Sequence, residues 1–144
     1  LDSANSWPHN NKGLVFNDLG KREEALRCYD RAIEANPTNS WPYYNKGLVL
    51  NDLGKKEEAL ACYNKAIELN PTNSHTYNNN KGNILNDLGN KEEALACYNK
   101  AIELAPTSSR AYNDKGVILT DLGRKEDALV CYDKAIELDL ASVA

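Results

Sequence analysis

The sequence predicts an all-α fold, an α-solenoid in which antiparallel helical hairpins stack on one another. The first observation is an internal repeat, because residues 51–74 and 86–109 agree at 21 of 24 positions. The second is a helical spacing of apolar residues, three and four apart, within each copy. The third is the regular placement of residues that interrupt helices: all eight glycines fall at two positions of the repeat, and a proline ends each of the first three copies.

The repeat divides the chain into four units. Asp-Leu-Gly occurs once in each copy and Ala-Ile-Glu follows it every time. Such a period defines the architecture before any single helix is assigned. We expect units at residues 6–39, 40–73, 74–108 and 109–144, of which the third is one residue longer and the fourth has no clear capping helix.

The first helix of a unit can be read from residues 40–53. Ser40 is a good N-cap, and Pro42 suits the first turn, where the N–H that proline lacks has no helical partner. Gly54 is expected to end the helix in the left-handed conformation. Between them, one face carries apolar or small residues at spacings of three and four, namely Tyr43, Gly47, Leu50 and Leu53.

The second helix is expected to begin near Lys56 and to stop before Pro71, because the residue preceding a proline avoids helical dihedral angles. Its buried face is predicted at Ala59, Leu60, Tyr63, Ala66 and Ile67. A hairpin of this size has apolar positions on several faces, so it must stack on its neighbours to bury them. Small residues at the crossings, such as Gly47, allow the helices to approach closely.

The extra residue of the third unit lies between Pro71 and Gly82. If Tyr77 keeps the packing site of the other units, the helix must contain a π-turn. If it does not, Asn78 takes that site and the preceding loop is longer. We favour the bulge, because a buried asparagine would need a hydrogen-bond partner.

Composition excludes several classes of function. A net charge of −4 argues against a general nucleic-acid binder, which needs a basic face. No apolar run approaches the length of a membrane span, and the charge balance suits a cytoplasmic protein. His9 and His75 form no acid–base pattern. Every glycine belongs to the repeat, which leaves none for a phosphate-binding loop. We therefore expect no enzyme and no cofactor. Since the chain begins with Leu1 and contains no methionine, we expect it to be a fragment.

The four cysteines mark one position of the repeat, at separations of 34, 35 and 34 residues. The cysteine ligands of zinc sites usually occur in pairs only a few residues apart in the sequence, so this spacing does not predict a zinc site. Neighbouring copies are expected on the order of 10 Å apart, too far for a disulfide. We therefore expect small buried side chains and no metal at Cys28, Cys62, Cys97 and Cys131.

The repeated residues resemble the tetratricopeptide repeat (TPR), and the resemblance covers about residues 6–140. It implies a right-handed superhelix whose first helices line a concave groove that holds a peptide or a partner protein. Two departures stand out: a lysine replaces the usual leucine in every first helix, and Leu140 replaces the last proline. The second unit carries the pattern as Tyr43, Gly47, Leu50, Gly54, Ala59, Tyr63, Ala66 and Pro71.

The groove face of the first helices is rich in asparagine, a mediocre helix former. Asn11, Asn45 and Asn80 recur at one position, which Asp114 occupies in the fourth unit. A side-chain amide offers both a donor and an acceptor to the backbone of an extended peptide. This resembles the asparagine ladders of some TPR proteins. The alternative is that duplication copied one solvated asparagine.

Other residues of this face are candidates for the same groove. Leu14, Leu48 and Tyr44 would anchor apolar side chains, and Asn83 stands where the first two units have leucine. The residues of a second row either contact the ligand or cap or brace neighbouring hairpins, and they are Asn17, Asn51 and Asn86. A third row either favours a basic partner or bonds within the turn: Asp18, Asp52, Asp87 and Asp121.

The resemblance also implies a test of one subtype, the carboxylate clamp that holds the acidic tails of heat-shock chaperones. Of the five clamp positions only Asn45 fits, because Asn10, Leu14, Thr76 and Asn80 stand at the others. We therefore expect an extended or basic partner segment and no binding of these tails.

Two other functions remain open. The array could self-associate end to end through its uncapped last hairpin, where Leu129, Ile136, Leu138 and Leu140 are expected to be exposed in whole or in part. It could also be a consensus-like or designed array without a natural ligand.

Overall fold

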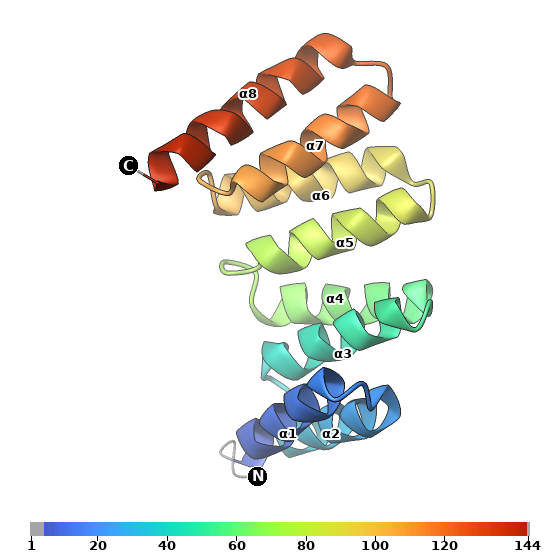
Figure 1. Cartoon of the computed structure of the whole chain (residues 1–144). Coiled ribbons are helices and arrows are strands. Elements are labelled where there is room, and N and C mark those ends of the chain that lie inside the picture. Colours follow the sequence, from blue (N-terminus) through green and yellow to red (C-terminus); the bar gives the residue numbers. More distant parts are fainter. Residues whose placement is uncertain (1–4, 144) are drawn as a thin grey trace. The chain divides into compact units, whose positions relative to one another are not determined.

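The computed structural model describes residues 5–143, which contain eight α-helices and no β-strand (Figure 1). Residue 144, the last of the fourth expected unit, lies outside the described residues. The helices are α1 (Ser6–Asp18), α2 (Arg22–Ala35), α3 (Ser40–Asp52), α4 (Lys56–Leu69), α5 (His75–Asp87), α6 (Lys91–Leu104), α7 (Ser109–Asp121) and α8 (Lys125–Ser142).

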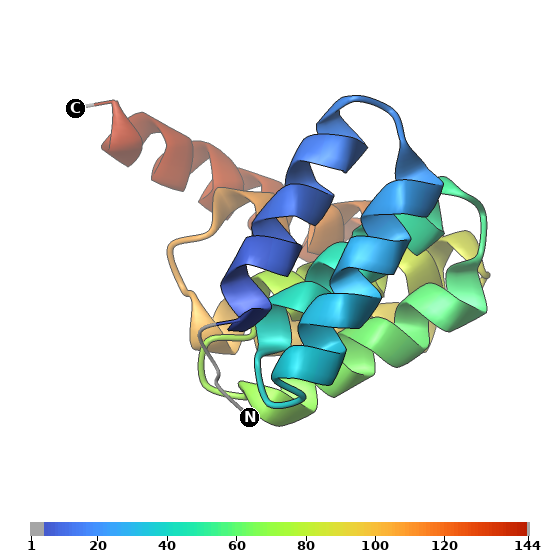
Figure 2. The same ribbon diagram turned by 90° about the horizontal axis from the view of Figure 1, so that it is seen from below.

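The contacts divide the chain into two compact units, which meet in sequence at Pro71 and Thr72. In the first unit, α1 pairs with α2 and α3 with α4, and α2 packs against α3. The second unit repeats this arrangement with α5 to α8. Figure 2 shows α1 and α2 side by side and antiparallel, joined by a short turn. The predicted antiparallel hairpins are confirmed.

Each hairpin turns at a glycine with positive φ. Gly54 has a φ of 78°, and its N–H donates to the carbonyl of Asn51 at 2.9 Å. The N–H of Lys55 reaches back to the carbonyl of Leu50, also at 2.9 Å. Together these bonds form a Schellman motif, which satisfies the last carbonyls of α3 and confirms the predicted role of Gly54.

The start of α3 differs from the prediction by one residue. The N-cap is Asn39, whose side-chain oxygen accepts the backbone N–H of Trp41 at 3.2 Å. Ser40 is the first helical residue and is buried. Both residue types are good caps, and the prediction of Ser40 was wrong because Asn39 has the extended backbone that a cap requires.

The first glycine of each repeat allows close helix packing, as predicted. A Cβ placed on Gly47 would lie 2.8 Å from the ring of Tyr63, and one on Gly82 would lie 2.7 Å from Tyr98. These tyrosine rings are almost completely buried. The first helix of each hairpin therefore rests directly on a tyrosine of the second.

The extra residue of the third repeat lies in the connection and not in a bulge. α5 has 13 residues and no π-turn, like α1, α3 and α7. Asn78 takes the buried site, and its amide donates to the carbonyl and the hydroxyl of Ser74, each at 3.0 Å. Tyr77 shifts by one position and remains only 2% exposed. The predicted bulge was wrong because Ser74 supplies the hydrogen-bond partner that a buried asparagine needs.

The last helix is longer than its counterparts. α8 has 18 residues, whereas α6 has 14, because Leu140 stands where proline ends the other second helices. Its apolar residues Leu129, Ile136 and Leu140 are exposed, while Leu138 is half-buried. Within the described residues, no helix combines the length and the apolar character that crossing a membrane requires.

Candidate functional site

The predicted site residues lie mainly on the first helices of the hairpins. In the first unit, α1 and α3 lie side by side, and in the second unit α5 and α7 do. We call the surface that each pair forms the first-helix face of that unit. The two faces carry different side chains.

Large exposed side chains characterise the first-helix face of the first unit. Trp7 and Trp41, the two tryptophans of the chain, occupy the same position of successive repeats and are 47% and 46% exposed. Leu14 is exposed and Leu48 is half-buried. Leu14 and Leu48, which the sequence predicts as apolar anchors, and the two tryptophans thus leave apolar surface exposed on α1 and α3.

Aromatic contacts link α3 to the hairpin interior. The rings of Trp41 and Tyr44 meet edge to face with centroids 6.0 Å apart, and Tyr44 lies 5.8 Å from Tyr63. Burial, then the neighbouring Tyr44, raises the pKa of the Tyr63 hydroxyl. Tyr44 therefore connects the face to the core.

A buried amide pair joins α1 to α3. The Asn45 amide donates to Oδ1 of Asn10 at 2.9 Å, and both side chains are buried. The ladder residue Asn45 thus already has a partner within the chain. Asn10 is not among the ladder residues that the sequence predicts. Asn11, the first residue of the ladder, is exposed.

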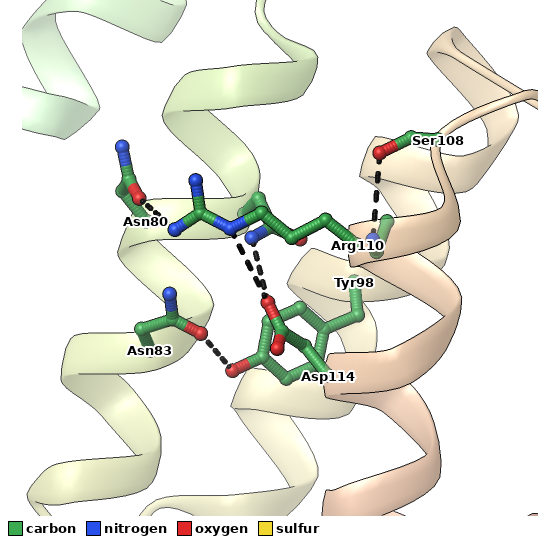
Figure 3. A network of polar contacts seen from close by, with 8 residues as sticks. Asn80, Asn83, Tyr98, Ser108, Arg110 and Asp114 are labelled. Carbon is green, nitrogen blue, oxygen red and sulfur yellow. Dashed lines mark hydrogen bonds and ion pairs between the residues drawn. The ribbon is translucent and has the colours of Figure 1, made fainter. Parts of the chain in front are cut away.

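The corresponding pair of the second unit carries a charge. The Asn79 amide donates to the carboxylate of Asp114 at 2.9 Å, and these residues are separated by 35 positions, as Asn10 and Asn45 are. The guanidinium of Arg110 donates to Oδ1 of Asn80 at 3.1 Å, and its Nε lies 3.8 Å from Asp114 (Figure 3). The ladder residues Asn80 and Asp114 are therefore joined through Arg110.

Asn83 also bonds within the chain. The hydroxyl of Tyr98 donates to its Oδ1 at 2.5 Å (Figure 3). Burial, then the charge of Asp114, raises the pKa of Tyr98, so the phenol keeps its proton and remains a donor. The first two repeats have leucine in place of Asn83, and so cannot make this bond.

A small cavity of about 50 Å³ adjoins this network. Asn79 lines it and is only 5% exposed, and its Oδ1 has no hydrogen-bond partner among the described residues. The volume suits ordered water, which would satisfy this oxygen. The other lining residues are His75, Thr76, Ala101, Ser108, Arg110 and Ala111.

The second and third rows of candidates are partly used for bracing. Lys56 donates to Asn51 at 3.2 Å and Lys91 donates to Asn86 at 3.1 Å, in each case within one hairpin. Lys91 also pairs with Asp121 of the following hairpin, at 3.2 Å. The remaining members of these rows are Asn17, which is half-buried, and Asp18, Asp52 and Asp87, which are exposed.

The cysteines lie in the second helices as predicted. Cys28, Cys97 and Cys131 are buried, Cys62 is half-buried, and all four are free thiols. Burial raises the pKa of the thiols of Cys62, Cys97 and Cys131, so they are poor nucleophiles. Residues 5–143 contain no cluster of histidine, cysteine and carboxylate side chains that could hold a metal.

The model of the tetratricopeptide repeat matches residues 40–73, 78–108 and 109–139, and a second TPR repeat model matches residues 13–54. No curated protein sequence is significantly similar to the chain.

Solved structures share the fold. A crystal structure of MamA superposes with a TM-score of 0.90 at 22% identity, covering 96% of this chain and 81% of that one. MamA from Desulfovibrio magneticus gives a TM-score of 0.83 at 25% identity, covering 93% and 75%. The first TPR of Spaghetti (RPAP3), bound to an HSP90 peptide SRMEEVD, gives 0.81 at 28%, covering 85% and 97%. These relatives confirm the predicted fold class, an all-α solenoid.

Proposed function

Because this chain belongs to the tetratricopeptide repeat family, whose members are scaffolds for protein interaction and not enzymes, we propose that its first-helix faces bind an extended segment of a partner protein. The proposal rests chiefly on the two half-exposed tryptophans, Trp7 and Trp41, on one face. Tryptophan is prominent among the residues that dominate binding energy at interfaces. Exposing two of them at equivalent positions favours a binding surface.

On the first unit, the partner segment would be held by apolar contact. The indoles would receive apolar side chains, together with Leu14, Leu48 and Tyr44. Asn45 is oriented by Asn10, so it would meet a peptide group without first losing rotamer freedom. Asn11 would extend this row at the exposed end of the ladder.

On the second unit, polar contacts would dominate. The Arg110 guanidinium is mostly exposed and is held between Asn80 and Asp114, so it can offer further N–H groups to peptide carbonyls. Asp114 balances its charge, and Asn83 lies nearby on α5. The exposed carboxylates of Asp52 and Asp87 favour a segment that carries lysine or arginine.

Acidic chaperone tails are not the ligand that we propose. A relative was solved with the acidic peptide SRMEEVD, but this chain places Asn10 and Leu14 where the clamp of the family would need lysine and asparagine. Binding two carboxylates there would desolvate them without a cation to pair with them.

The intrinsic fluorescence of the chain tests the proposal directly, because both tryptophans lie on the proposed site. The full chain would be titrated with extended peptides that alternate leucine and lysine, and with SRMEEVD. We expect a saturable fluorescence change with the former and none with the latter. No change with any basic, apolar peptide would reject the site and favour an array without such a ligand.

Matched variants localise the binding. Asn45→Ala with Asn80→Ala should weaken binding roughly 30-fold, since each amide contributes on the order of 1 kcal/mol, while helicity is retained. Val130→Ala, an exposed change on α8, should have no effect. Unchanged affinity of the double variant would refute the ladder while leaving the tryptophan anchors to be tested by Trp41→Ala.

A further inference from the structure

We propose that the open face of the last hairpin binds α1 of a second copy of this chain, so that copies associate head to tail. The proposal is independent of peptide binding. It rests on a correspondence between the contact that α3 makes inside the first unit and the side chains left uncovered on α8 and α1.

The apolar part of the internal contact centres on Val49 of α3. Val49 is completely buried against Ala25 and Tyr29 of α2, with Leu26 and Phe16 packed around them. The residue equivalent to Val49 on α1 is Val15, which is 58% exposed. α1 therefore presents the same apolar side chain that α3 buries.

The receiving surface is equally uncovered on α8. Tyr132 is equivalent to Tyr29 but is half-exposed, and Leu129 and Ile136, the equivalents of Leu26 and Ile33, are largely exposed. Tyr132 and Ile136 line an open hollow of about 500 Å³. The hollow also includes Ser109, Arg110, Asn113, Ala135 and Asp139.

The polar bonds of the internal contact recur as complementary pairs at the two ends. Asn39 donates to Ser6 at 3.3 Å and Asn45 to Asn10 at 2.9 Å. The equivalent donors on α1 and just before it are Asn5 and Asn11. The equivalent acceptors line the hollow, and they are Ser109 and Asn113.

The charges match as well. Lys46 of α3 pairs with Asp30 of α2 at 2.7 Å. Burial lowers the pKa of Lys46, but the hydrogen bond and charge of Asp30 outweigh this and raise it. The equivalents are Lys12 on α1 and Asp133 on α8, whereas the second and third repeats have asparagine in place of Asp30.

A second ion pair repeats the pattern. Lys91 of α6 pairs with Asp121 of α7 at 3.2 Å, and the equivalents are Lys125 on α8 and Asp18 on α1. Four polar pairs and one apolar contact are thus complementary between the two ends. A contact of this kind joins different surfaces, so it propagates from copy to copy.

Sedimentation of the 144-residue chain at increasing concentration tests the proposal. We expect the weight-average mass to rise with concentration. Val15→Glu on α1 and Ile136→Glu on α8 should each weaken association at least about tenfold, because each would bury an unpaired carboxylate. A wild-type chain that stays monomeric up to millimolar concentration would overturn the proposal.

A matched control lies on the same helix. Val130 is exposed on α8. Its equivalents, Arg27 on α2 and Ala96 on α6, stay exposed although α2 packs on α3 and α6 on α7. A contact of the same kind on α8 would therefore leave Val130 uncovered. Val130→Glu should therefore associate like the wild type. An equal loss in Val130→Glu would show a nonspecific apolar association and overturn the proposal.

Charge reversal tests the direction of the contact. Lys12→Asp and Asp133→Lys should each associate more weakly alone, because every contact would then join like charges. An equimolar mixture should recover association, since the new aspartate on α1 of one variant would meet the new lysine on α8 of the other. Sensitivity to Ile136→Glu without sensitivity to Lys12→Asp would indicate a symmetric contact between two α8 helices and refute the head-to-tail arrangement.

Discussion

The two units use the same scaffold to present different first-helix faces. Where α1 meets α3, a neutral amide pair, Asn10 and Asn45, lies beside exposed tryptophans. Where α5 meets α7, Asn79 bonds to the carboxylate of Asp114, and Arg110 covers the pair. The glycines, alanines and tyrosines beneath are the same in both units. The repeat thus keeps its buried contacts constant while the side chains of its face vary.

The largest expected effect tests whether glycine packs against the buried tyrosine equally tightly in the two units. Gly47→Val and Gly82→Val would each push side-chain atoms into a tyrosine ring, because an added Cβ alone would lie 2.8 Å and 2.7 Å from that ring. We expect each to lower the free energy of unfolding by about 3 kcal/mol. Urea denaturation followed by circular dichroism would measure it. A large difference between the two variants would contradict the equivalence of the hairpins.

The next effect separates the two polar pairs. Asp114→Ala removes a charged acceptor from the buried Asn79 amide, and we expect a loss of about 2 kcal/mol in unfolding free energy. Asn45→Ala removes a neutral donor and should cost about 1 kcal/mol. The same urea experiment compares them, with the exposed Asn113→Ala as control. Equal losses would mean that the charge adds nothing to the pair.

A smaller effect concerns Asn83, the residue that replaces leucine in the second unit. Asn83→Leu would leave the buried Tyr98 hydroxyl without its acceptor, and we expect a loss of about 1 kcal/mol. Tyr98→Phe in the same background should restore most of that loss, because the unpaired hydroxyl is then absent. A gain in stability from Asn83→Leu alone would show that the hydrogen bond is dispensable.

The smallest effect is a pH dependence. Burial, then the charge of Asp18, raises the pKa of Tyr29 from 10.0 to about 12. The folded state therefore holds this proton longer than the unfolded state. Stability should be unaffected by Tyr29 below pH 10.0 and should fall as the pH rises towards 12. Tyr29→Phe should weaken this fall in alkaline titrations, and an unchanged curve would contradict the assignment.

Much of the fold was predictable because its determinants are local. Gly54 and Pro71 mark helix ends through backbone restrictions that act wherever they occur. Gly47 and Tyr63 could be predicted to pack because their period places them on facing sides of one hairpin. The error at Asn78 has a different origin, since the geometry of a connection depends on a single partner, Ser74.

The site was less predictable because it depends on how neighbouring helices are rotated. The sequence placed Asn45 on the first-helix face but did not pair it with Asn10. Asn10 and Asn45 are 35 residues apart, and so are Asn79 and Asp114. This separation is one more than that of equivalent residues, so it could have indicated which side chains of neighbouring first helices pair. Which of these side chains meet a ligand depends on the ligand's own shape.

The connection from Asn70 to Ser74 accepted an added residue while every helix on either side kept its ordinary length. The added residue of the third repeat is thus accommodated between two hairpins and not within one. For protein engineering, this segment is the natural place to insert an epitope or a protease site, and a hairpin with its connection is the natural module to add or delete.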